Sequence, residues 1–99
     1  MNQPPTPYAW TITTDRIDDG DAVGMCGPFG CHLTEDEIKH HADVERFRLL
    51  DGDGDVYLYG YYIDLSGSSS GFGPLDDLGR SYGCTSIQYR DNHGEYVEL

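Results

Sequence analysis

The stretch LLDGDGDVYLYGYYI restricts the fold more than any other part of the chain. Phe47 and Leu49 alternate with other residues before DGDGD, and Val56 and Leu58 alternate with other residues after it. An alternation of period two places one set of side chains on one face of a β-strand. Glycine supplies positive φ angles and aspartate suits turn positions. The sequence therefore predicts a β-hairpin whose turn is DGDGD.

Other periodic segments predict the remaining elements. WTITTDRI, CTSIQYR and EYVEL have the alternation and the β-branched or aromatic content of strands, and AVGMCG is a candidate for one more. In LTEDEIKHHADV, Thr34 and Glu37 have the spacing of a capping box, which predicts one short helix. PLDDLG predicts a single helical turn that begins after Pro74 and ends at Gly79.

These segments together predict the fold class and the domain organisation. We expect an α+β fold, with a mostly antiparallel sheet of about 4–6 strands and one short helix packed on one face. Residues 10–99 are predicted to form a small single domain, because a chain of 99 residues has the length of one domain. Residues 1–9 contain three prolines and are predicted to be a flexible N-terminal segment.

Charge is the extreme feature of the composition. Eighteen acidic residues stand against six basic ones, for a formal net charge of -12. Such a charge repels nucleic acid and anionic membranes and attracts basic protein surfaces. No apolar run is long enough for a transmembrane helix, no secretory signal pattern is present, and three cysteines do not make a disulfide framework. The predicted location is the cytoplasm.

Metal and catalytic motifs are incomplete. DGDGD resembles the start of an EF-hand loop, but Val56 and Tyr62 occupy the positions that require glycine and a bidentate glutamate. Cys26, Cys31 and His32 offer soft ligands, but zinc sites usually use a second ligand pair. No nucleophile motif and no phosphate-binding glycine loop is recognisable. We therefore expect no enzyme activity, no cofactor and no metal, and whether these cysteines and Cys84 are core or surface residues stays open.

Tyrosines and carboxylates remain as candidate binding groups. Tyrosine is favoured at interfaces because it joins a large rigid ring to a hydroxyl. Alternation places Tyr57, Tyr59 and Tyr61 on one face of the strand after DGDGD and Tyr62 on the other. The alternative is that these tyrosines pack under the helix and the Gly/Ser loop with only their hydroxyls exposed. An acidic rim around them would suit a basic partner. The candidate partner-binding residues are Asp18, Asp19, Asp21, Asp51, Asp53, Asp55, Tyr57, Tyr59, Tyr61, Asp76 and Asp77.

Four stretches carry a resemblance to a known family. WTITTDRI, AVGMCGPFG, FRLLDGDGDVYLYG and PLDDLGRSYGCTSIQYR occur in this order over most of residues 10–99. Taken together they resemble a family of small uncharacterised acidic proteins of bacteria and their phages. The resemblance implies an origin in a mobile element and implies no biochemical activity.

Charge and the implied origin lead to a hypothesis about function. We expect a non-enzymatic acidic inhibitor that acts as a DNA mimic of the anti-CRISPR or anti-restriction type. Surplus carboxylates on one face of a small domain can occupy a basic nucleic-acid-binding groove. Its predicted partner is a basic host protein in a nucleic-acid-binding complex, with no direct contact to nucleic acid or membrane. The alternatives are an acidic structural or accessory domain whose charge serves solubility only, and a weak metal-binding domain.

Overall fold

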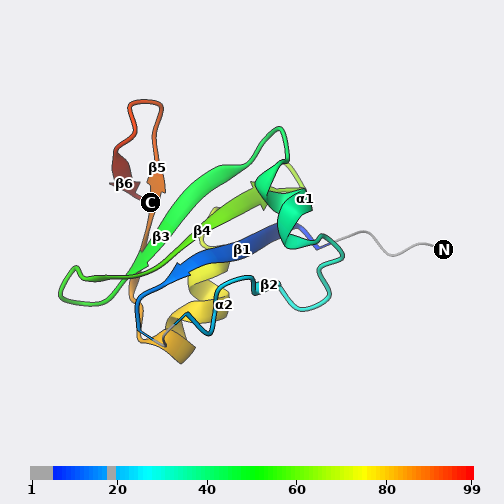
Figure 1. Ribbon diagram of the computed structural model, residues 1–99. Helices are drawn as coiled ribbons and strands as arrows, with labels where there is room; N and C mark the ends of the chain where they lie inside the picture. The colour runs from blue at the N-terminus through cyan, green and yellow to red at the C-terminus, as the bar shows by residue number, and fades with distance from the viewer. Residues whose placement is uncertain (1–5, 18–19) are drawn as a thin grey trace.

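The computed structural model describes residues 6–17 and 20–99 as a small α+β domain built on one six-stranded antiparallel sheet (Figure 1). The strand order is β2-β1-β4-β3-β5-β6. This architecture confirms the predicted class of a mostly antiparallel α+β domain. The elements are β1 (Tyr8–Asp15), β2 (Cys26–Gly27), α1 (Glu35–Lys39), β3 (Glu45–Leu50), β4 (Val56–Asp64), α2 (Gly73–Tyr82), β5 (Ser86–Arg90) and β6 (Tyr96–Glu98).

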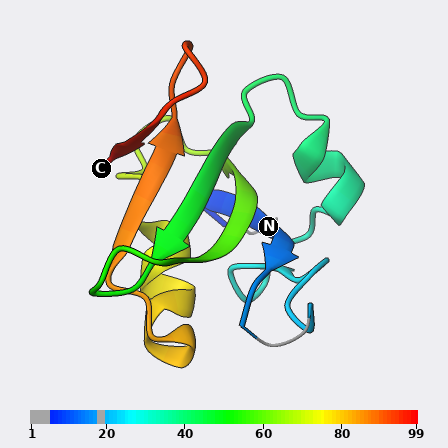
Figure 2. The same cartoon turned by 60° about the vertical axis from the view of Figure 1, so that its left-hand side comes forward.

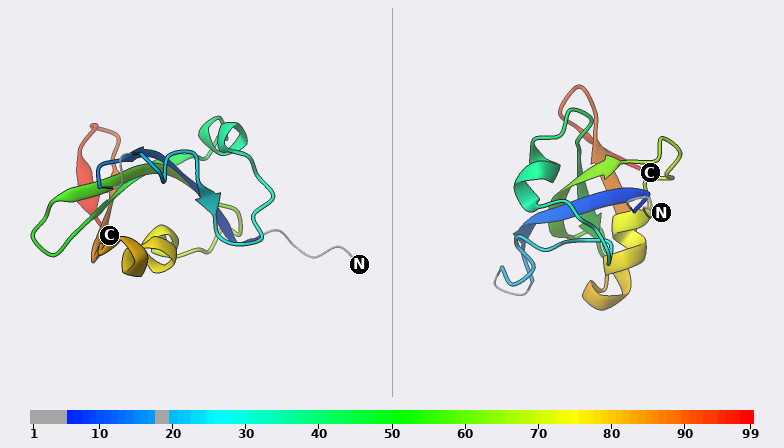
Figure 3. Two further views of the ribbon diagram at one scale, coloured as in Figure 1. Left: turned by 60° about the horizontal axis from the view of Figure 1, so that its bottom comes forward. Right: turned by 90° about the vertical axis from the view of Figure 1, so that its right-hand side faces the viewer.

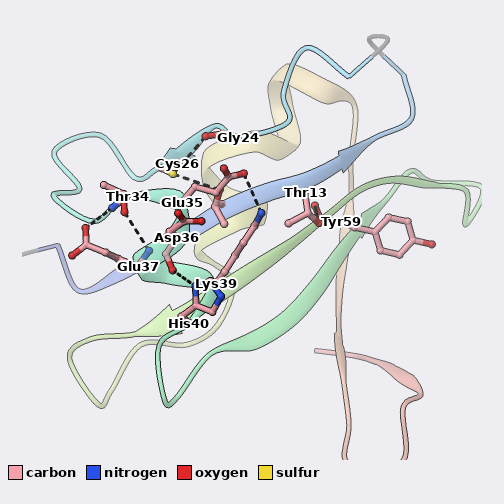
Figure 4. A network of polar contacts seen from close by, with 11 residues as sticks. Thr13, Gly24, Cys26, Thr34, Glu35, Asp36, Glu37, Lys39, His40 and Tyr59 are labelled. Carbon is pink, nitrogen blue, oxygen red and sulfur yellow. Dashed lines mark hydrogen bonds and ion pairs between the residues drawn. The ribbon is translucent and has the colours of Figure 1, made fainter.

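The helix that the capping box predicts is present but short. Thr34 Oγ1 accepts from the N–H of Glu37 at 3.2 Å, and the Glu37 carboxylate accepts from the N–H of Thr34 at 2.9 Å (Figure 4). α1 ends after Lys39, earlier than the predicted segment LTEDEIKHHADV allows. Ile38 is its one buried residue, so a further turn would gain little from burial.

A second helix corrects the prediction of a single helical turn at PLDDLG. α2 has ten residues and ends at Gly83, which has φ 74° and the left-handed conformation of a helix cap. Gly79 does not end the helix. Its lack of a side chain lets the helix backbone approach Cys84 and Leu75 closely. A Cβ there would lie 2.9 Å from the carbonyl oxygen of Cys84 and 3.0 Å from Leu75 Cδ1. The sequence alone does not distinguish a glycine that ends a helix from a glycine that allows close packing within one.

The start of the sheet also differs from the sequence prediction. Tyr8 and Ala9 lie in β1, although residues 1–9 were assigned to a flexible segment, and Ala9 is fully buried. The candidate strand AVGMCG is mostly a turn, and only Cys26 and Gly27 pair with β1. Burial of Ala9 against Ile38 and Ile63 explains why β1 begins earlier than the proline-rich composition indicates.

The two faces of the sheet are covered unequally. α2 lies on one face over a core that includes Trp10, Phe47, Leu58 and Tyr62, and α1 lies on the other face near one end (Figure 3). Among the described residues, the hydrophobic cluster on the α1 side has three buried members, of which Ile38 is one. Much of that second face is therefore not covered by any helix.

Two hairpin turns in the sheet use the same hydrogen bonds. In the turn between β3 and β4, Asp51 Oδ1 accepts from the N–H groups of Asp53 and Asp55, both at 2.9 Å. In the turn between β5 and β6, Asp91 Oδ1 accepts from the equivalent N–H groups at 2.8 and 3.0 Å. Gly54 and Gly94 have positive φ angles at the same place in the two turns. The prediction of a hairpin at DGDGD is confirmed, with the first aspartate organising the turn.

Candidate functional site

The hairpin tip exposes two of its three predicted aspartates for binding. Asp51 is held by the turn, and hydrogen bonds from the N–H of Asp55 first, then from the Tyr57 hydroxyl, lower the pKa of its carboxyl group. Asp53 and Asp55 are exposed at the tip. Their carboxylates are not used by the turn itself, so they remain available to a partner.

The loop after β1 adds a third exposed carboxylate. Asp18 and Asp19 lie outside the residues that the structure describes, whereas Asp21 is exposed in a turn. The Asp15 carboxylate accepts a hydrogen bond from the N–H of Ala22 at 3.0 Å, which holds the end of the loop beside the last residue of β1. The N–H of Ile12 then donates to the carbonyl of Met25 at 3.0 Å. These bonds give the chain around Asp21 a defined position next to β1.

The strand register brings these two segments to the same end of the sheet. Asp15, the last residue of β1, pairs with Leu58 near the start of β4, and the N–H of Arg16 donates to the carbonyl of Tyr57 at 2.9 Å. The β3–β4 hairpin and the described parts of the loop after β1 therefore project from one end (Figure 2). We call this surface the acidic end, defined by Asp21, Asp53 and Asp55.

Exposed apolar residues accompany the acidic end, and the sequence did not single them out. Ile17, Val23 and Met25 are 38%, 48% and 39% exposed in the loop after β1. The run AVGMCG contains Val23 and Met25, but its apolar content was interpreted as a candidate strand. Of the loop residues that the structure describes before β2, Ala22 is the one that enters the core, and the Asp15 carboxylate accepts a hydrogen bond from its N–H. Apolar side chains next to carboxylates are a usual composition for a protein interface.

Asp76 and Asp77 lie elsewhere, in the first turns of α2. Asp77 Oδ2 accepts from the indole Nε1 of Trp10 at 2.8 Å and from the hydroxyl of Tyr8 at 2.9 Å. It thereby ties α2 to the first half of β1, whereas the acidic end lies beyond the last residue of that strand. The structure does not bring these two aspartates together with the other predicted carboxylates.

The predicted row of three tyrosines is broken by a β-bulge. Leu49 pairs with Leu58 and Leu50 with Val56, so Tyr57 has no partner in β3. Tyr57 packs against the larger core cluster, while Tyr61 packs against the cluster under α1. The alternation rule fails at Tyr57 because an extra residue in one strand reverses which face the next side chain meets. The prediction that Tyr57 shares a face with Tyr59 and Tyr61 is wrong.

A different tyrosine completes the aromatic surface. Tyr96 of β6 meets Tyr59 of β4 edge to face, with ring centroids 6.1 Å apart. Figure 4 shows Tyr59 away from the α1 network, over a part of the sheet that α1 does not cover. Tyr59, Tyr61 and Tyr96 line one shallow groove of about 270 Å³ with Arg46 and Thr13. The sequence did not select Tyr96 because its strand is far from β4 along the chain.

Arginines accompany these rings. The guanidinium carbon of Arg46 lies 5.4 Å from the centroid of Tyr61, and that of Arg48 lies 4.3 Å from the centroid of Tyr96. Arg46 and Arg90 line a second groove of about 360 Å³. We call this surface the Tyr–Arg face, defined by Arg46, Arg48, Tyr59, Tyr61, Arg90 and Tyr96.

The cysteines do not assemble a site in this structure. Cys84 is buried, and burial first, then the charge of Asp51, raises the pKa of its thiol to about 11. Cys26 and Cys31 are half-buried, and His32 is exposed. Within residues 6–17 and 20–99, no group of three or more histidine, cysteine, aspartate or glutamate side chains is placed to hold a metal ion.

Comparisons with protein-family models, curated proteins and solved structures find no match to this chain. The resemblance to small acidic proteins of bacteria and phages stays a prediction, and so does the cytoplasmic location. No helix in the described residues is long and apolar enough to cross a membrane. What the protein binds must therefore be inferred from the chemistry of its surfaces.

Proposed function

We propose that this protein is a non-enzymatic interaction module of phage or mobile-element origin. It docks its acidic end on a basic, nucleic-acid-binding surface of a host protein and acts as an inhibitor, in the manner of anti-CRISPR or anti-restriction DNA mimics. The observation that carries the proposal is that Asp21, Asp53 and Asp55 lie in two segments that project from the same end of the sheet. Their carboxylates are exposed, and the hairpin holds two of them in a fixed turn.

The carboxylates of the acidic end form no ion pair with a basic side chain among the described residues, although the exposed Arg16 follows β1 at the same end. Among the described residues, the one ion pair joins Lys39 to Glu35 at 3.4 Å, in α1. A cluster of uncompensated carboxylates accelerates association with a basic surface and makes it sensitive to salt. Ile17 and Val23 supply apolar contacts beside the carboxylates, and such contacts slow dissociation. The acidic end thus combines the two components that a stable docking surface requires.

The proposal is tested by reversing the same number of charges at two different places on the protein. The protein is used to capture partners from host lysate at about 0.05 M salt and again at about 0.5 M salt, where the Debye length has shrunk to roughly 4 Å. Asp53→Lys/Asp55→Lys reverses two charges of the acidic end. Asp36→Lys/Asp43→Lys reverses two exposed carboxylates near α1 and gives the same net charge.

We expect the unaltered protein to retain a nucleic-acid-handling partner at low salt and to release it at high salt or when duplex DNA is added. The acidic-end variant should lose the partner, and the α1 variant should keep it. Equal loss in both variants would show that only the overall charge matters. That result, or capture of no partner at either salt, would favour the solubility hypothesis.

A further inference from the structure

The arginines of the Tyr–Arg face require an explanation. The chain has six basic residues against eighteen acidic ones, so each arginine has many possible carboxylate partners. Nevertheless Arg46, Arg48 and Arg90 gather on one sheet face, and none is ion-paired with a carboxylate in the described part of the chain. Arg46 and Arg90 even line the same groove, although like charges close together on a sheet are unfavourable.

Neighbouring residues contact the guanidinium groups of Arg48 and Arg90. Arg48 Nε donates to the side-chain oxygen of Gln88 at 2.7 Å while its guanidinium lies over the Tyr96 ring. The guanidinium of Arg90 folds toward the β5–β6 turn, where a Cβ on Gly94 would lie 3.2 Å from Arg90 Nη2. Planar guanidinium groups in fixed positions lose less conformational entropy when an anion binds.

The aromatic rings define the second part of the ligand. Tyr59, Tyr61 and Tyr96 are half-buried, so each ring retains accessible surface. Tyrosine rings and guanidinium planes on an open sheet are surfaces on which nucleobases stack, and the arginine N–H groups bind phosphate. Carboxylate peptides would satisfy the arginines but would offer no planar group to the rings. Both features fit a strand of unpaired nucleotides.

We infer that the Tyr–Arg face is a binding site for single-stranded nucleic acid, with bases stacked on Tyr59, Tyr96 and the guanidinium planes and phosphates on Arg46 and Arg90. The inference opposes the sequence-based expectation of no direct contact with nucleic acid. That expectation follows from the net charge of -12. Glu45 and Asp91 line the groove of Arg46 and Arg90, but the Asp91 carboxylate accepts hydrogen bonds within the β5–β6 turn. The field of carboxylates farther away than about 8 Å is screened at physiological ionic strength. The inference goes beyond the proposed docking function and does not depend on it.

The test measures fluorescence anisotropy of labelled DNA and RNA single strands of about six nucleotides at low salt, a length within the usual site size for a stacking platform. Binding of either strand supports the site. Arg46→Gln/Arg48→Gln should weaken binding by more than about 10-fold and lower the salt dependence by about 0.7 per lost phosphate contact. Arg16→Gln/Arg80→Gln removes two exposed arginines outside the face and should leave the affinity nearly unchanged.

Tyrosine variants separate stacking from charge. Tyr59→Leu should weaken binding without changing the salt dependence, whereas Tyr59→Phe keeps the ring and should bind normally. Circular dichroism and thermal melting are measured for every variant. If Tyr59→Leu does not fold, Tyr96→Leu near the end of the chain replaces it.

Several outcomes would overturn the inference. They are no anisotropy change at low salt, equal loss in the two arginine pairs, equal competition by polyglutamate, and duplex DNA binding as tightly as the single strand. The proposed docking function is read separately. Asp53→Lys/Asp55→Lys should abolish capture of the host partner without weakening oligonucleotide binding. Arg46→Gln/Arg48→Gln should weaken oligonucleotide binding without abolishing capture of the host partner.

Discussion

Replacing Asp77 with alanine tests whether this aspartate holds the fold together, as its contacts indicate, or contributes only to a binding surface. Its carboxylate accepts from Trp10 Nε1 at 2.8 Å and from the Tyr8 hydroxyl at 2.9 Å. Trp10 is only 3% exposed, so water cannot fully replace the bond to its indole N–H. A hydrogen bond to a charged group contributes about 1.5–3 kcal/mol, and water can satisfy the more exposed hydroxyl. We therefore expect Asp77→Ala to lower the free energy of unfolding by about 2 kcal/mol.

The assay is thermal and urea unfolding followed by circular dichroism. For a domain of this size, about 2 kcal/mol corresponds to a fall in Tm of about 8–16 °C. Asp76→Ala is the matched control, because Asp76 is exposed on the same helix turn and makes no side-chain hydrogen bond. Its loss should cost at most about 1 kcal/mol through the helix dipole. Trp10→Phe removes the indole N–H. In a protein that carries Trp10→Phe, Asp77→Ala should therefore lower the free energy of unfolding by at least about 1 kcal/mol less than it does in the unaltered protein. Equal destabilisation by the two aspartate variants, or no coupling with Trp10, would refute the reasoning.

The other predictions concern packing, pH and thiol reactivity. Gly60→Ala should destabilise the protein by at least about 1–3 kcal/mol, because the added Cβ would clash with the carbonyl oxygen of Thr11 in β1. Gly52→Ala is the control, because an added Cβ there has nothing within 4 Å. In urea melts it should leave the stability nearly unchanged. The folded-state pKa of Asp51 lies below its unfolded value, so its contribution is full above about pH 3.9 and is lost as pH falls through the folded pKa. Urea melts from about pH 2 to 6 should then show a weaker pH dependence for Asp51→Asn, and an unchanged dependence would contradict this. A thiol reagent at about pH 8 should label the two half-buried cysteines first, since burial raises the pKa of Cys84 to about 11; equal rates would show that Cys84 is accessible.

Local patterns were sufficient for those parts of the molecule that depend on neighbouring residues. The alternation around DGDGD predicted the hairpin, and Thr34 with Glu37 predicted where α1 begins. The length of α2 was missed because Gly79 has the appearance of a helix stop. Its actual role, close packing against Cys84, depends on a contact that no sequence window contains.

The candidate sites were less predictable because they depend on which distant segments meet. The sequence selected Asp53 and Asp55 as partner-binding residues, and the structure leaves both exposed, but it also selected Asp51 and Asp77, whose carboxylates accept hydrogen bonds within the fold. It grouped the tyrosines with aspartates, whereas the structure groups Tyr59 and Tyr61 with arginines.

The sequence by itself determined most of the strands, the hairpin turn at DGDGD and the large negative charge, because these follow from residue identity and from neighbours a few positions apart. Only the tertiary structure decided how that charge is distributed. Strand pairing brings the loop after β1 and the β3–β4 hairpin to one end, and it places Tyr96 beside Tyr59 across the sheet. A single extra residue in β4 removed Tyr57 from the aromatic row. Long-range register determines which side chains share a face, and a local alternation cannot specify it.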